Sequence, residues 1–245
     1  MDDFGSGFSS PDFLQKVPFD TVKFDMQFMR NFDSGEKSRI ILTELIKLMI
    51  ALGLETVVEG VETMEQVEFL REIGCTKLQG FYYSKPIPVE EIMSRYKNGS
   101  HIGFENPSES AYYEVVGKLN LYDLSFIVEG SENLQNYFET MPICVVEYSK
   151  KGITAIRSNT SHKKFIEKQF PDLTDPNNTN QGTLAENSVF MRGIRQCSRD
   201  GRNVVIAQRA ADGTVIHVLI KRIADNPVSG ASAFVCIGLS DRLLR

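Results

Sequence analysis

Acidic side chains stand at predicted strand-to-loop transitions in the first part of the chain. Asp2 and Asp3 are adjacent, Glu59 and Glu62 follow a predicted strand, and Lys23 lies inside another. Because the carboxyl ends of parallel strands share one edge, these side chains can converge on a single site. Mg²⁺ and Mn²⁺ prefer such carboxylate ligands, and a pair of these ions can clamp the attacking and leaving oxygens of a phosphodiester. The alternative is a glycine-rich terminal loop with solvated acids and a surface lysine.

Alternating strand and helix patterns surround these residues. Residues 20–25 are typical of a short strand, and Asp33 with Glu36 forms a capping box that predicts a helix ending at Gly53. Its predicted apolar face consists of Ile41, Leu45, Leu48 and Leu52. A first strand–helix unit is therefore expected.

A second unit follows directly. Residues 55–59 predict a strand, and Thr63 with Gln66 forms a capping box for a helix that ends before Gly74. Residues 77–83 predict a third strand, and a short helix is expected from Pro88 to about Tyr96. The apolar stripe of the middle helix consists of Val67, Leu70 and Ile73. Strands alternating with helices predict a parallel sheet, either open or closed into a barrel.

Composition indicates a soluble globular protein with one large or two ordinary domains. The chain has 245 residues, of which 42% are hydrophobic and 24% charged. The sequence contains no apolar run long enough for a membrane span and no basic, apolar leader, so we expect a cytoplasmic protein. The four cysteines show no paired spacing and are interpreted as buried or idle thiols in a reducing compartment: Cys75, Cys144, Cys197 and Cys236.

The net charge is unevenly divided. Residues 1–97 hold 16 acidic and 11 basic side chains, whereas residues 98–245 hold 16 of each. This distribution argues against a DNA- or RNA-binding surface, which would need clustered Lys and Arg. It is compatible with carboxylates gathered around a divalent metal, and also with an ordinary solvated surface.

The composition and the order of the predicted elements change after residue 97. Residues 97–111 have linker composition, and a connecting helix is expected around 112–140. Strands are then predicted at 143–148, 153–156, 203–209, 214–223 and 232–240, with helices near 159–170 and 186–198. A polar loop is expected at 171–182, and residues 211–213 predict a tight hairpin. This order predicts a five-stranded antiparallel sheet with helices packed on one face.

Four motifs in the first part of the chain resemble the signatures of the EAL domain family. They are Asp-Asp-Phe-Gly-Ser-Gly-Phe-Ser-Ser (2–10), Val-Lys-Phe-Asp (22–25), Val-Glu-Gly-Val-Glu-Thr (58–63) and Leu-Gln-Gly-Phe (78–81). Their order and intervals suit the family, with Ser6 and Phe8 as mild departures. The resemblance implies a (β/α)₈ barrel that hydrolyses cyclic di-GMP to linear pGpG with two Mg²⁺ or Mn²⁺ ions.

The resemblance also implies roles for particular residues. Asp2 would bridge the two metals, Asp3 would bind the second, and Lys23 would contact the hydrolytic water. Glu59 would hold metal-bound water and serve as general base, and Gln79 would line the site. A family loop that orders metal and substrate would include Phe4, Gly5, Ser6 and Gly7, with Glu62 as a supporting partner.

Part of the family pattern has no counterpart in this sequence. Residues 1–97 can supply only about the last three strands of such a barrel and the end of a fourth. The Glu-Ala-Leu or Glu-x-Leu-x-Arg signature, an Asn and a further Glu, which complete the first metal's coordination and the substrate contacts in the family, have no counterpart here. The chain is therefore expected to be a fragment of a phosphodiesterase with an incomplete barrel and negligible turnover.

Residues 131–245 resemble a PAS domain in the order of their predicted elements, with 98–130 as linker and connecting helix. The resemblance implies a sensory module that binds an unknown small ligand or a dimer partner, with no cofactor identifiable. His162 is interpreted as a residue of a polar helix start and His217 as an ordinary sheet position. Two hypotheses follow for the chain: part of a cyclic-di-GMP phosphodiesterase, or a non-catalytic regulatory or sensor module.

Overall fold

The computed structural model describes residues 1–6, 14, 16–98, 106–122, 141–171, 188–210 and 213–239. They fall into two compact units. The first unit contains residues 1–110 and 117–119, and the second contains residues 111–116 and 120–245. No helix in the described part of the chain is both long and apolar enough to cross a membrane.

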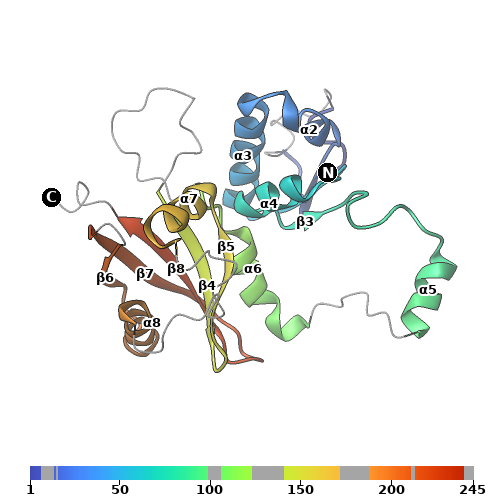
Figure 1. Cartoon of the computed structure of the whole chain (residues 1–245). Coiled ribbons are helices and arrows are strands. Elements are labelled where there is room, and N and C mark those ends of the chain that lie inside the picture. The colour runs from blue at the N-terminus through green and yellow to red at the C-terminus, as the bar shows by residue number, and fades with distance from the viewer. Residues whose placement is uncertain are drawn as a thin grey trace. The chain divides into compact units, whose positions relative to one another are not determined.

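The first unit is built on a small parallel sheet (Figure 1). Its three strands are β1 (Thr21–Phe24), β2 (Glu55–Val58) and β3 (Lys77–Leu78), in the order β1-β2-β3. All pairings are parallel, which confirms the predicted parallel sheet. The helices of the unit are α2 (Gln27–Arg30), α3 (Glu36–Ala51), α4 (Met64–Glu72) and α5 (Val89–Lys97), with a 3₁₀ turn at Phe32–Ser34.

Helix α3 differs from its prediction in two respects. The predicted capping box of Asp33 and Glu36 is wrong: Asp33 lies in the 3₁₀ turn, and Gly35 precedes the helix without a side-chain cap. Burial of Phe32 takes the chain into the core just before the helix and shifts its start. The buried face consists of Leu42, Ile46 and Met49, whereas three of the four predicted core residues are exposed: Ile41, Leu48 and Leu52. Both faces of α3 carry apolar residues at helical spacing, so periodicity could not select the buried one.

Helix α4 follows its prediction closely. The hydroxyl of Thr63 accepts from the backbone of Gln66, whose side chain in turn accepts from the backbone of Thr63, which confirms the capping box. Val67, Leu70 and Ile73 are buried as predicted. Strand β3, in contrast, covers only Lys77–Leu78, because the chain turns at residues 80–83 instead of continuing as a strand.

The second unit is a five-stranded antiparallel sheet, as predicted (Figure 1). Its strands are β4 (Ile143–Ser149), β5 (Gly152–Ser158), β6 (Val204–Arg209), β7 (Val215–Asp225) and β8 (Ser232–Leu239), in the order β5-β4-β8-β7-β6. Helices α7 (Thr160–Gln169) and α8 (Val189–Asp200) match the two predicted helices. Most of the predicted connecting helix and polar loop, and two residues of the predicted 211–213 hairpin, lie outside the described residues.

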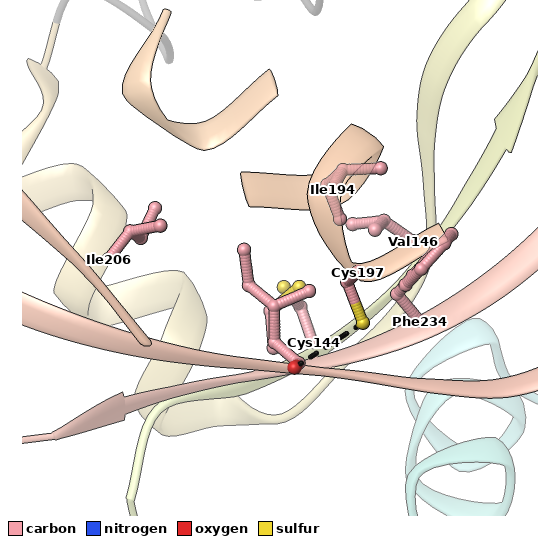
Figure 2. Close-up of a cluster of buried hydrophobic side chains, with 8 residues drawn as sticks. Cys144, Val146, Ile194, Cys197, Ile206 and Phe234 are labelled. Carbon is pink, nitrogen blue, oxygen red and sulfur yellow. Dashed lines mark hydrogen bonds between the residues drawn. The ribbon is translucent and has the colours of Figure 1, made fainter. Parts of the chain in front are cut away.

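Helices cover both faces of this sheet, which corrects the prediction of one covered face. Ile194 and Cys197 of α8 (Figure 2) pack with Cys144 and Val146 of β4. Glu147 points to the opposite face because side chains alternate along a strand. There its carboxylate accepts a hydrogen bond of 2.6 Å from Tyr112, a residue of α6 (Ser110–Lys118). Helix α6 coincides with the start of the helix predicted around 112–140, most of which lies outside the described residues.

Tyr112 supplies a testable contribution to the stability of this unit. Its side chain is buried, and burial together with the neighbouring Glu147 carboxylate raises the pKa of the phenol. We expect Tyr112→Phe to lower the free energy of unfolding by about 1.5–3 kcal/mol, the usual range for a hydrogen bond to a charged group. Tyr113→Phe is the matched control because Tyr113 is exposed. Equal denaturation midpoints for the two variants would contradict this role of Tyr112.

Candidate active site

Lys23 lies on the open face of the parallel sheet. Val22 and Phe24 on either side of it are fully buried, so alternation directs Lys23 to the other face. Lys23 pairs with Val57 of β2, and Glu59, two residues after Val57, lies on the same face. The backbone N–H of Gln79 donates to Val58, which places Gln79 beside Glu59. Three segments thus present polar side chains at the carboxyl edge of the sheet.

The N-terminal residues extend this edge. The backbone N–H of Lys23 donates to the carbonyl of Met1, and that of Phe4 donates to the carbonyl of Lys23, both at 2.9 Å. Phe4 and Phe24 form a parallel bridge, and their rings contact edge to face. This short ladder holds Asp2 beside Lys23.

Four predicted site residues meet at one point. The ammonium of Lys23 lies 2.7 Å from Oε1 of Glu59 and 3.4 Å from Oδ1 of Asp2. The amide of Gln79 donates to the same Oε1 of Glu59 at 3.2 Å. The carboxylate of Glu59 is therefore fixed by two donors on two different segments.

The electrostatics of this cluster keep Lys23 protonated. Its hydrogen bond to Glu59 and its contact with Asp2 raise the pKa of the ammonium, while burial lowers it. The Glu59 side chain is 16% exposed and the Asp2 side chain 71%, so the contact of Lys23 with Glu59 is better shielded from solvent than its contact with Asp2. Lys23 thus neutralises a nearly buried carboxylate at the sheet edge.

The other predicted residues lie around this cluster. Asp3 has a positive φ of 52° and donates its backbone N–H to Asp2, and the Ser6 hydroxyl donates to the Asp3 carbonyl. Phe4 is buried, and Gly5 has a φ of 98° against the ring of Phe28. Glu62 is exposed and donates its backbone N–H to the side chain of Gln66. Gly7 lies outside the described residues.

Two glycines beside the catalytic candidates belong to the quoted motifs, but no role was predicted for them from the sequence. Gly60 follows Glu59 with a φ of 74°, and a Cβ there would lie 2.8 Å from Cβ of Met26. Gly80 follows Gln79, and a Cβ there would overlap the backbone of Val61. The signal was present in the sequence as a glycine directly after each polar residue, and such a glycine often marks a close backbone approach.

Gly80 gives a sharp test of how the site is held. We expect Gly80→Ala to push Gln79 away from Glu59 and to lower the free energy of unfolding by about 1–3 kcal/mol, as for other overpacked sites. The control is Gly117→Ala in α6, where a Cβ meets nothing within 4 Å. Chemical denaturation measures both variants, and a Gly80→Ala protein as stable as the control would contradict the close approach.

The donor set of the site fits a divalent cation in part. Asp2 and Glu59 offer oxygen ligands of the kind that Mg²⁺ and Mn²⁺ prefer, and they already converge on the cationic group of Lys23. Within the described ranges, however, no three His, Cys, Asp or Glu side chains are grouped closely enough to hold a metal ion. The side-chain positions therefore supply two of the ligands of such a site.

The first part of the chain is similar to a known family. Residues 1–86 match the EAL domain. The match includes the segments that carry Asp2, Lys23, Glu59 and Gln79. It covers about a third of the chain, and the second unit lies beyond it.

Curated relatives share this region. The cyclic di-GMP phosphodiesterase RocR of Pseudomonas aeruginosa is 39% identical over 100 residues, which are 41% of this chain and 25% of RocR. An uncharacterized signaling protein of Caulobacter vibrioides is 42% identical over 92 residues, 38% of this chain and 11% of that protein. The oxygen sensor protein DosP of Escherichia coli is 39% identical over 92 residues, 38% of this chain and 12% of DosP. The matched region thus spans a quarter or less of each of these relatives.

Solved structures match the same region. An EAL domain protein from Listeria monocytogenes is 46% identical, with a TM-score of 0.38 and 40% of each chain covered. The Klebsiella pneumoniae protein BlrP1, in a complex with manganese and cyclic di-GMP, is 32% identical with a TM-score of 0.33, over 35% of this chain and 22% of BlrP1.

Proposed function

We propose that residues 1–86 form the carboxyl-edge part of a site that hydrolyses cyclic di-GMP to the linear dinucleotide. The convergence of Asp2, Lys23, Glu59 and Gln79 on one point carries this proposal. The match to the EAL domain, and identity to a relative that is a cyclic di-GMP phosphodiesterase, support it.

Each of these residues has its own role in the proposed hydrolysis. Glu59 is the general base, since its carboxylate is shielded and held in one orientation by Lys23 and Gln79. Lys23 places a positive charge beside the reacting phosphate and orients the attacking water. Asp2, Asp3 and Glu59 would hold divalent cations, which supply charge neutralisation and a more acidic water when bound.

We propose that this polypeptide has negligible turnover alone. Its sequence has no counterpart of the Glu-Ala-Leu or Glu-x-Leu-x-Arg signature, or of the Asn and Glu that would complete the metal and substrate contacts. The residues present would instead bind Mg²⁺ or Mn²⁺ weakly and would function within a complete (β/α)₈ barrel.

Manganese binding tests the metal part of the proposal on the chain as it is. Electron paramagnetic resonance follows the loss of the aqueous Mn²⁺ signal as protein is added. We expect weak binding that Asp2→Ala/Asp3→Ala removes. The matched control is Glu90→Ala/Glu91→Ala, which changes an exposed acidic pair on α5 by the same charge. Equal Mn²⁺ binding by the two double variants would overturn the proposed ligand roles.

For the second unit we propose a PAS-like sensory module, which binds a small ligand or a dimer partner, in a cytoplasmic protein. The sheet order β5-β4-β8-β7-β6 supports this, because the early hairpin β4–β5 and the late meander β6–β7–β8 join through the β4–β8 pairing into one sheet. Such a unit would regulate the phosphodiesterase part of the same chain.

A further inference from the structure

Two cysteines that are far apart in sequence face each other at the centre of the second unit. Cys144 of β4 and Cys236 of β8 are register partners, and both are buried. Two residues away along the chain from each cysteine, the backbone N–H of Gly238 donates to the carbonyl of Pro142. Because hydrogen-bonded pairs recur at every second position of an antiparallel ladder, Cys144 and Cys236 also form a pair of the hydrogen-bonded type. The Cα atoms of such pairs are about 5.5 Å apart, within the range that a disulfide spans.

The third cysteine of the cluster is engaged elsewhere. Cys144, Cys197 and Cys236 belong to the same buried cluster (Figure 2). The thiol of Cys197 on α8 donates to the carbonyl of Ile220 at 3.7 Å. Cys144 and Cys236 are therefore the pair whose backbones are positioned for a bond between their sulfurs.

His162 connects this pair to the surface. Its imidazole helps to lower the pKa of the Cys144 thiol, and its side chain is partly exposed at the start of α7. The fully buried Asn159 fixes this arrangement, since its side-chain oxygen accepts from the backbone of both Ile143 and His162. One residue thus ties the helix that carries His162 to the strand that carries Cys144.

The two thiols are chemically unequal. Hydrogen bonds from Cys236 and then from His162 lower the pKa of Cys144, whereas the contact with Cys144 and burial raise that of Cys236. Burial raises the pKa of the Cys75 thiol in the first unit to about 11. A thiolate beside a neutral thiol is the arrangement of a nucleophilic and a resolving cysteine.

We propose that Cys144 and Cys236 form a redox-active dithiol that hydrogen peroxide converts to a cross-strand disulfide. The Cys144 thiolate attacks one peroxide oxygen, the O–O bond breaks, and the departing hydroxide takes a proton to become water. The sulfur of Cys236 then displaces the hydroxyl of the Cys144 sulfenic acid, and a second water leaves with the Cys236 proton. The dithiol has lost two electrons to peroxide, and β4 is bonded to β8.

Thiol counting and peptide mapping test this on the full chain. After treatment with hydrogen peroxide at neutral pH, we expect two of the four thiols to be lost. Mass spectrometry of the digest should show a peptide that links Cys144 to Cys236 and disappears with dithiothreitol. A bridge through Cys197 or Cys75, oxidation to sulfinic acid without a bridge, or four intact thiols would each overturn the proposal.

Variants separate the roles within the cluster. Cys144→Ser and Cys236→Ser should abolish the bridge, while Cys197→Ala and Cys75→Ala should retain it. His162→Gln should slow bridge formation, with Lys163→Gln as the exposed neighbouring control. An unchanged rate of disulfide formation in His162→Gln would overturn the role proposed for His162. Peptide mapping of the unsubstituted chain tests for the bond between Cys144 and Cys236 even if a cysteine variant fails to fold.

Discussion

Glu59→Gln is expected to remove cyclic di-GMP hydrolysis from any complete domain that contains this site. The assay requires a complete barrel, which a chimaera provides if residues 1–86 replace the matching stretch of the Pseudomonas aeruginosa relative RocR. Loss of a positioned general base costs about 10²–10⁴-fold in rate. The neutral amide keeps the shape of Glu59 and its contact with Gln79, so the loss reports the carboxylate itself.

Glu65→Gln is the control for this substitution. Glu65 is an exposed residue in the first turn of α4, and its replacement makes the same chemical change close by in the chain. Release of the linear dinucleotide is measured by chromatography, and circular dichroism checks that each variant folds. If Glu59→Gln retained the turnover of Glu65→Gln, Glu59 would not be the base.

Lys23→Met should have opposite effects on catalysis and on metal binding. In the chimaera it should lower turnover by about 10²–10³-fold, the usual cost of removing one group that stabilises charge in the transition state. In the isolated chain, the ammonium of Lys23 lies between Asp2 and Glu59, where it competes with a divalent cation. Its removal should therefore tighten Mn²⁺ binding.

Lys77→Met is the matched control for this prediction. Lys77 forms an ion pair of 2.9 Å with Glu55, on the same sheet but at the amino ends of the strands. Its removal should leave both turnover and Mn²⁺ binding unchanged. If Lys23→Met weakened Mn²⁺ binding, the Lys23 cluster would be a structural ion pair that organises the carboxylates and not a competitor for the metal.

The sequence predicted the elements that carry the site better than their packing. Strands near Lys23 and Glu59 were found because short β-runs and a capping box at Thr63 are local signals. The buried face of α3 was wrong because both faces are apolar, and only tertiary contacts select Leu42 over Ile41. Local patterns define an element, but they do not define its neighbours.

In the candidate site, too, the sequence predicts some features and leaves others to the tertiary structure. Convergence of Asp2, Lys23 and Glu59 could be expected from parallel strands that share an edge. The hydrogen bond of Gln79 to Glu59 and the close approach of Gly80 to Val61 depend on strand register. The pairing of Cys144 with Cys236 likewise requires the antiparallel register of β4 and β8, which cysteine spacing cannot reveal.

Cyclic di-GMP hydrolysis by the chimaera, with and without Asp2→Ala/Asp3→Ala, is the decisive measurement for the proposed site. If residues 1–86 supply the carboxyl-edge part of a phosphodiesterase site, the chimaera should release the linear dinucleotide in the presence of Mg²⁺ or Mn²⁺. The double variant should fold equally well and release none. A folded chimaera without turnover, or turnover that survives the loss of both aspartates, would show that residues 1–86 do not supply this part of the site.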